Sequence, residues 1–189
     1  SEMCIRDSNV IQGLGTEAGG PLVEHQDVDV ISFTGSTCVG RWIAETAGKR
    51  LAKVSLELGG KNPLVVCDDA DLDNALKWVC LSAFSNAGQR CASGSRIIIF
   101  ESIFEEFKKR LLTATKALSI GPNDSDDLGP VINKKQLNNM LTALESAKLA
   151  GATILTGGER IETEEHKKGF YIMPTLIENV QPEDDISKK

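Results

Sequence analysis

Residues 28–51, VDVISFTGSTCVGRWIAETAGKRL, carry the pattern that decides the expected fold. VDVISF (28–33) is rich in β-branched residues and predicts a short strand. After the turn FTGSTCVG (33–40), apolar residues such as Ile43 and Ala47 recur at helical spacing and predict a helix. A strand joined to a helix by a short Gly/Ser turn is the unit from which parallel α/β sheets are built.

The same alternation of strand and helix signals continues along the rest of the chain. Turn residues separate the segments, Asp71 is placed to cap the helix that follows it, and Gly151 is placed to end a later one. This order predicts an α/β fold with a mainly parallel sheet and helices on both faces. The further strands are expected at 54–58, 61–67, 95–102, 152–158 and 169–178, and the further helices at 72–87, 103–118 and 134–150.

Composition limits the class of protein. The chain has 189 residues, of which 41% are hydrophobic and 25% charged, with a net charge of −6, which is typical of a soluble globular protein. An acidic chain makes a nucleic-acid partner unexpected, and no apolar run approaches the roughly 20 residues that cross a membrane. Five cysteines without regular spacing indicate a reducing compartment, which makes the cytoplasm the expected location.

The turn at 33–40 is the first place where the sequence suggests chemistry. Gly35, Ser36, Thr37 and Gly40 follow a strand and precede a helix, so backbone N–H groups at the helix N-terminus are available to a phosphate. The alternative is a tight connection in which Ser36 or Thr37 caps the helix. An earlier glycine-rich stretch, GLGTEAG (13–19), is either another close backbone approach or a loop.

The second place is LELGGKNP (56–63), where Glu57 ends a strand and two glycines follow. Gly59 and Gly60 allow a sharp turn and leave room beside the carboxylate. An acidic side chain in an apolar run is costly to bury without a partner, which favours a functional role. The alternative is a surface-facing residue in ordinary strand alternation.

The third place is NAGQRCAS (86–93), where Cys91 follows Arg90 in a loop of small residues. A thiol in an open setting beside a cation is one that favours the reactive thiolate. The alternative is a small buried cysteine. That structural interpretation is the one we give to three other cysteines: Cys38, Cys67 and Cys80.

Taken in order, FTGST, LELGGK and GQRCAS resemble the NAD(P)-dependent aldehyde dehydrogenase superfamily, and the resemblance runs from Asn9 to the C-terminus. It implies a partial Rossmann-type cofactor domain followed by an α/β catalytic domain with a mainly parallel sheet. Residues 9–56 would be the C-terminal part of the NAD(P)-binding domain, and 57–189 a C-terminally truncated catalytic domain. Residues 1–8 match nothing in the family and are interpreted as a scar or a non-native start.

The resemblance also implies roles for individual residues. Cys91 would attack the aldehyde carbonyl and carry first a thiohemiacetal and then a thioester. Glu57 would activate the water that hydrolyses the thioester. The implied cofactor residues are Gly35, Ser36, Thr37 and Gly40 at the pyrophosphate, Val39 and Gly15 at the adenine, and Leu58 near the nicotinamide.

The implied cofactor is NAD or NADP, and the implied partner is a small-molecule aldehyde, with no nucleic acid and no membrane. The full-length protein would be a homodimer or homotetramer. An oxyanion asparagine and the ribose-binding segments of the family are not found in this sequence. We therefore expect this stretch of chain to be inactive by itself.

Other functions are weighed against this one. A coenzyme-A-acylating semialdehyde dehydrogenase and a non-catalytic remnant of the fold remain as alternatives, although Glu57 and Cys91 are both present. A cysteine hydrolase would need a histidine near Cys91, and the only two, His25 and His166, are interpreted as surface residues. A metal site is not expected, since the chain has no histidine pair and no C-x-x-C.

Overall fold

The computed structural model describes residues 8–188, so all but the last residue of the expected scar at 1–8 lies outside the described part. The chain divides into two compact units, one ending at Gly59 and the other beginning at Gly60. The assignment of a cofactor domain to 9–56 and a catalytic domain to 57–189 stays a prediction.

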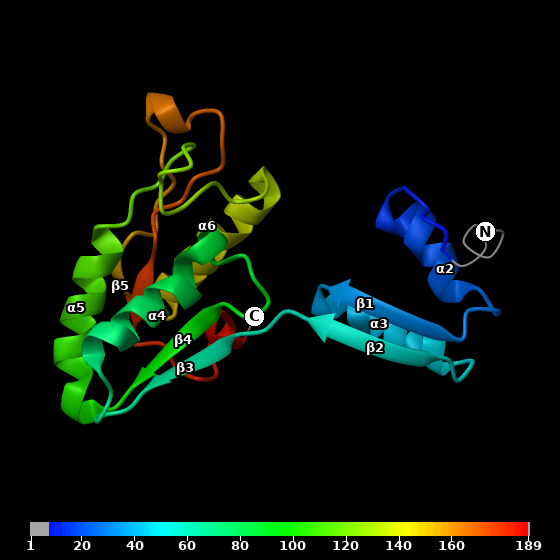
Figure 1. Ribbon diagram of the computed structural model, residues 1–189, viewed down its shortest axis with the longest axis horizontal. Helices are drawn as coiled ribbons and strands as arrows, with labels where there is room; N and C mark the ends of the chain where they lie inside the picture. Colours follow the sequence, from blue (N-terminus) through cyan, green and yellow to red (C-terminus); the bar gives the residue numbers. More distant parts are fainter. Residues whose placement is uncertain (1–7, 189) are drawn as a thin grey trace. The chain divides into compact units, whose positions relative to one another are not determined.

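The first unit is a parallel strand–helix–strand motif preceded by short helical turns (Figure 1). Its two strands pair in parallel, with Val30 beside Lys53 at one end and Gly35 beside Leu58 at the other. The connecting helix packs on both strands and buries Ile43 and Ala47. The elements are η1 (Gly15–Gly19), α2 (Gly20–Glu24), β1 (Val30–Gly35), α3 (Thr37–Gly48) and β2 (Lys53–Leu58).

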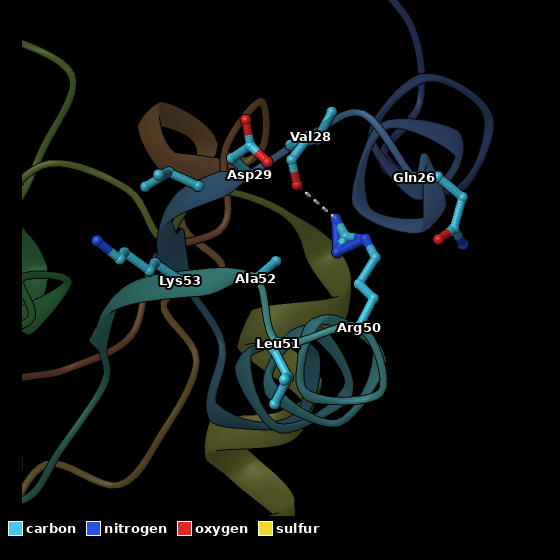
Figure 2. A pocket seen from close by; sticks show the side chains of 8 residues that line it. Gln26, Val28, Asp29, Arg50, Leu51, Ala52 and Lys53 are labelled. Carbon is cyan, nitrogen blue, oxygen red and sulfur yellow. Dashed lines mark hydrogen bonds between the residues drawn. The ribbon is translucent and has the colours of Figure 1, made fainter.

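Arg50, just after α3, ties this unit together at the amino-terminal ends of its strands (Figure 2). Its Nε donates to His25 O at 3.2 Å, and its Nη2 donates to Val23 O at 3.1 Å and Val28 O at 2.9 Å. Arg50 Nη1 is buried and finds no hydrogen-bond partner among the described residues. Arg50 also lines an adjoining cavity of about 240 Å³. Since its guanidinium binds three backbone carbonyls, we interpret its role there as structural.

The second unit repeats the parallel strand–helix–strand motif and adds further helices and a pair of antiparallel strands (Figure 1). β3 and β4 pair in parallel, with α4 between them in sequence, whereas β5 and β6 pair antiparallel. The elements are β3 (Asn62–Val66), α4 (Leu72–Phe84), η2 (Ser85–Gly88), β4 (Gly94–Ile99), η3 (Glu101–Ile103), α5 (Phe104–Lys116), α6 (Lys134–Leu149), β5 (Thr153–Thr156), η4 (Glu164–His166), β6 (Leu176–Glu178) and α7 (Asp185–Lys188).

Helix ends follow the predicted capping residues. The Asp71 carboxylate accepts hydrogen bonds from the N–H groups of Asp73 and Asn74, each at 3.1 Å, and starts α4. After α6, Gly151 has a φ of +101°, a left-handed conformation that glycine adopts without strain. Both predicted helix boundaries are confirmed.

The core of the second unit lies on one face of the β3–β4 pair. Val66, Val79, Phe107 and Leu111 form a buried cluster between the strands, α4 and α5. On the opposite face Val65 is 53% exposed, so the described helices of the second unit lie on one face of this sheet, whereas helices were predicted on both. The predicted α/β fold class is confirmed, with two parallel sheets and one antiparallel sheet, each of two strands, among residues 8–188.

Candidate active site

The expected phosphate turn lies at the carboxyl end of β1. Ser36 is the N-cap of α3, and its Oγ accepts a hydrogen bond from Val39 N–H at 3.3 Å. The capping interpretation is therefore confirmed at Ser36, while Thr37 is the first residue of the helix. Gly35 is the last residue of the strand.

The cap still leaves donors for an anion. Within a helix the first N–H groups have no partner in the preceding turn, so those of Thr37 and Cys38 are unpaired by the helix itself. The first turn of α3 contains no acidic residue, and the residues from Gly35 to Val39 are exposed. A helix N-terminus in this state fits a phosphate group.

Gly40 packs directly against the side chain of Leu58. A Cβ built on Gly40 would lie 2.6 Å from Leu58 Cδ2, so a larger residue there would force the Leu58 side chain to move. Gly40 and Leu58, both expected near the cofactor, are thus brought together. Gly15 lies in η1, and a Cβ there would meet nothing within 4 Å.

Glu57 and Leu58 lie beside the phosphate turn. In the parallel ladder Glu57 is opposite Thr34, and Leu58 is opposite Gly35. The carboxyl ends of parallel strands are where α/β proteins bind ligands. One edge of the first unit therefore carries the five cofactor residues expected between positions 35 and 40, together with Glu57 and Leu58 of β2.

The Glu57 side chain is exposed, between the half-buried Leu56 and Leu58. This pattern is the ordinary strand alternation in which Glu57 faces the surface. The argument that Glu57 is functional because its charge is costly to bury therefore does not apply. Neither Gly59 nor Gly60 has a positive φ, so the backbone conformation does not require glycine at either position. The carboxylate is open to water.

Cys91 is exposed on a hydrogen-bonded turn of the second unit. Ser93 N–H donates to Arg90 O at 3.1 Å, and Arg90 N–H donates to Ser93 Oγ at 3.3 Å. These two bonds close a four-residue turn in which Cys91 is the second residue. The open setting expected for a reactive thiol is therefore present.

The chain enters this turn through a strained segment. Asn86, Ala87 and Gly88 have φ values of 54°, 52° and 70°, and the first two lack glycine's freedom in the left-handed region. The helix before them ends at Phe84, although the apolar pattern predicted its continuation to residue 87.

Side chains that the sequence analysis did not single out hold this loop. Asn62 Nδ2 donates to Cys91 O at 2.6 Å and to Ser93 O at 3.1 Å. Gln89 accepts from Ile132 N–H through Oε1 at 2.9 Å, and Ser82 Oγ accepts from Gly94 N–H at 3.0 Å. Asn62 lies inside LELGGKNP and Gln89 inside NAGQRCAS, so these two motifs are the sequence signal that could have pointed to them.

The remaining cysteines divide by exposure. Cys38 is exposed, so the expectation of a buried structural residue is wrong for it; it lies in the first turn of α3, whose outer side is uncovered. Cys67 and Cys80 are partly buried, and burial raises the pKa of the Cys80 thiol.

The two histidines also differ. His25 is exposed, as predicted, but His166 is buried and that prediction is wrong. The His166 ring nitrogens lie 2.5 Å from Thr163 Oγ1 and 2.8 Å from Ile120 O, and its ring meets Tyr171 edge-on. Both nitrogens are occupied by structural contacts, which leaves none for Cys91.

A cavity of about 330 Å³ lies in the second unit, with a mainly apolar lining that includes Phe84 and Leu176. Gly88 and Ser95, on either side of the cysteine turn, reach its wall. Lys61 also lines it, and burial lowers the pKa of its amine.

Residues 8–188 contain no cluster of His, Cys, Asp and Glu suited to a metal ion. Within the same range, no helix has the length and apolar character needed to cross a membrane.

Known proteins resemble the chain closely over nearly its whole length. It is 42% identical to alpha-ketoglutaric semialdehyde dehydrogenase of Bacillus subtilis over 183 residues, which is 96% of this chain and 38% of that protein. It is 45% identical to betaine aldehyde dehydrogenase 1 of Oryza sativa subsp. japonica, over 91% of this chain and 34% of the relative. The chain thus spans little more than a third of these relatives.

Solved structures agree. A crystal structure of betaine aldehyde dehydrogenase from Staphylococcus aureus in complex with NAD⁺ superposes with a TM-score of 0.90 at 35% identity, covering 94% of this chain and 35% of that one. The sequence model of the Aldehyde dehydrogenase family matches residues 8–189. The chain therefore belongs to the aldehyde dehydrogenase family.

Proposed function

We propose that the whole protein oxidises an aldehyde to a carboxylic acid and transfers hydride to NAD(P)⁺, with Cys91 as nucleophile and Glu57 as general base. The observation that carries this proposal is the exposed Cys91 thiol on a hydrogen-bonded turn, in a chain of this family. The chain's relatives are named for aldehyde substrates, which supports aldehyde oxidation.

The first half-reaction takes place on Cys91. Its thiolate attacks the aldehyde carbon, a C–S bond forms, and the carbonyl oxygen becomes an alkoxide that the Cys91 N–H would stabilise. When the alkoxide re-forms the carbonyl, the C–H electron pair leaves as hydride and a thioester remains. NAD(P)⁺, when bound, supplies the hydride acceptor.

The second half-reaction is hydrolysis. The Glu57 carboxylate accepts a proton from water while the water oxygen attacks the thioester carbon. The C–S bond breaks, the Cys91 thiolate is restored and the carboxylic acid leaves. Glu57 is exposed at the end of β2, where water reaches it.

The N–H groups at the start of α3 would bind the cofactor pyrophosphate. The exposed Gly35–Val39 turn and its lack of acidic residues support this role. Val39, Leu58 and Gly15 would line the rest of the cofactor site. The NAD⁺ complex of the Staphylococcus aureus relative favours NAD⁺, with NADP⁺ as the alternative.

We further propose a homodimer or homotetramer located in the cytoplasm. Relatives named as chloroplastic, mitochondrial or peroxisomal show that the family also occupies other compartments. Light scattering of the purified whole protein measures the assembly, and imaging of a tagged protein tests the location.

The decisive experiment is Cys91→Ser in the whole protein, assayed by cofactor reduction with a semialdehyde, betaine aldehyde and an aminoaldehyde. We expect turnover to fall by more than about 10³-fold, because a hydroxyl is a much poorer nucleophile at neutral pH. Cofactor binding should persist, and the matched control Cys67→Ser should keep full activity. Residual turnover within tenfold of wild type would contradict the role of Cys91.

Product analysis separates this function from the two alternatives. With coenzyme A present, formation of the free acid supports hydrolysis, whereas an acyl-coenzyme A product supports the acylating enzyme. No cofactor reduction with any aldehyde of the panel, by wild-type protein that binds NAD⁺, would favour the non-catalytic remnant.

A further inference from the structure

Cys91 is an exposed residue on a loop, so side-chain packing does little to fix the direction of its thiol. A nucleophile nevertheless reacts well only when it is held in a narrow range of orientations. The restraint must therefore come from hydrogen bonds to the backbone of the turn.

Asn62 supplies that restraint from a distant point in the sequence. Its Nδ2 lies 2.6 Å from Cys91 O and 3.1 Å from Ser93 O, so one amide nitrogen binds carbonyls on both sides of Ala92. Both partners only accept hydrogen bonds, so the nitrogen must be the atom that faces them. An amide nitrogen has two hydrogens, one for each carbonyl.

The bond to Cys91 O acts directly on the reactive residue. Rotation of the Cys91–Ala92 peptide plane interconverts turn types, and it changes the ψ angle of Cys91. The hydrogen bond that holds this carbonyl at 2.6 Å opposes that rotation. It thereby restrains the backbone from which the Cβ–Sγ bond projects.

The surroundings of Asn62 fit this role. It is the first residue of β3 and pairs with Gly94, and the register of the ladder shifts between Asn62 and Pro63. The pairing of its backbone and the two hydrogen bonds of its side chain keep the amide aimed at the cysteine turn.

We propose that Asn62 is a positioning residue that orients the Cys91 thiol through the Cys91 and Ser93 carbonyls. This inference rests on the function proposed above, because it assigns Asn62 a part in the same site. The sequence motif LELGGKNP does not reveal this role, and neither does the exposure of Cys91. The two hydrogen bonds of the Asn62 amide reveal it.

The test uses the whole protein with Asn62→Leu, which keeps the size of the side chain and removes the donor. We expect at least a tenfold fall in kcat and in the rate of Cys91 alkylation by iodoacetamide, with the KM for NAD⁺ within twofold. Asn62→Gln keeps an amide donor on a longer side chain and should recover part of both rates. Asn139→Leu is the control, since Asn139 is exposed on α6.

Alkylation of the half-buried Cys80 reports whether each variant is folded. Should Leu not be accommodated, Asn62→Ala is the second variant that lacks the donor. A folded variant without the donor whose kcat and Cys91 alkylation rate both stay within twofold of wild type would overturn the proposal. Alkylation of Cys91 requires no aldehyde, so this result is separate from any failure of the aldehyde assay.

Discussion

The two units present their candidate site residues in different ways. In the first unit, Gly35, Ser36 and Thr37 lie at the junction of one strand and one helix, and the cap is made three residues away at Val39. In the second unit, the turn that carries Cys91 is held by Asn62, 29 positions away in the sequence.

The difference shows how local each site is. The phosphate turn is formed by the ends of regular elements, and its donors are backbone groups that any sequence with the right caps provides. The cysteine turn depends on side chains that only the folded second unit brings together. Changes to core packing should therefore affect the second site more than the first.

The largest expected effect tests that dependence directly. Phe107 is fully buried in the cluster beneath β3 and β4, so Phe107→Ala should lower the free energy of unfolding of the second unit by about 3–5 kcal/mol. Hydrogen exchange should accelerate in peptides from β3 and β4 and stay unchanged in those from β1 and β2. The control Phe100→Ala, at a residue 45% exposed, should have a much smaller effect. Equal acceleration in both units would contradict this expectation.

A functional change in the first unit comes next. Glu57→Gln in the whole protein should slow the steady state by about 100-fold, the usual contribution of a general base, while the first burst of hydride transfer is spared. Rapid-mixing measurement of cofactor reduction separates the two phases. Glu45→Gln, at an exposed carboxylate on α3, should change neither. If burst and steady state fall together, Glu57 acts mainly on the thiol.

A smaller effect is expected at the helix cap. Ser36→Ala removes the acceptor of Val39 N–H, and loss of such a cap costs about 1 kcal/mol. Exchange of the amides in the first turn of α3 should accelerate, and the affinity for NAD⁺ should fall modestly. The control Ser55→Ala, at an exposed serine of β2, should leave both unchanged. An unchanged exchange rate at Val39 would show that the cap contributes nothing.

The smallest effect concerns pH. Burial lowers the pKa of Lys61 in the folded chain, below the ordinary lysine value of about 10.4. Between the lowered pKa of folded Lys61 and its ordinary pKa, the unfolded chain binds more protons than the folded chain. The free energy of unfolding therefore rises with pH in this range, and below it the buried charge of Lys61 destabilises the folded chain. Lys61→Met should therefore raise stability slightly at pH 7 and flatten part of the rise. Denaturant unfolding at several pH values measures this effect, with Lys77→Met at an exposed lysine as the control. Identical behaviour of the two variants would refute the expectation.

The long helices were the most predictable part of the fold. A helix was predicted at 134–150 with Gly151 to end it, and the structure has Lys134–Leu149. The weakest prediction was the strand at 169–178, of which only Leu176–Glu178 forms. Phe170 O and Tyr171 O instead accept hydrogen bonds from Val131 N–H and Ile161 N–H in loops, a pairing that no local pattern records.

The first site was equally predictable, because its parts are neighbours in the sequence. Gly35 and Ser36 were expected at a strand–helix turn and lie there. His166 shows the limit: it was interpreted as a surface residue, yet Thr163, Ile120 and Tyr171 contact it in the folded chain. Burial of a polar ring depends on partners that arrive from other segments.

The sequence by itself determined the alternation of strands and helices, the caps, and the three motifs that carry Glu57, Cys91 and the phosphate turn. These follow from side-chain periodicity and from residue types adjacent in the chain. Only the tertiary structure decided that Leu58 packs on Gly40, that His166 is buried, and that Asn62 holds the Cys91 turn. Such contacts join residues separated by many positions, and their geometry exists only once the strands have paired and the core has closed around them.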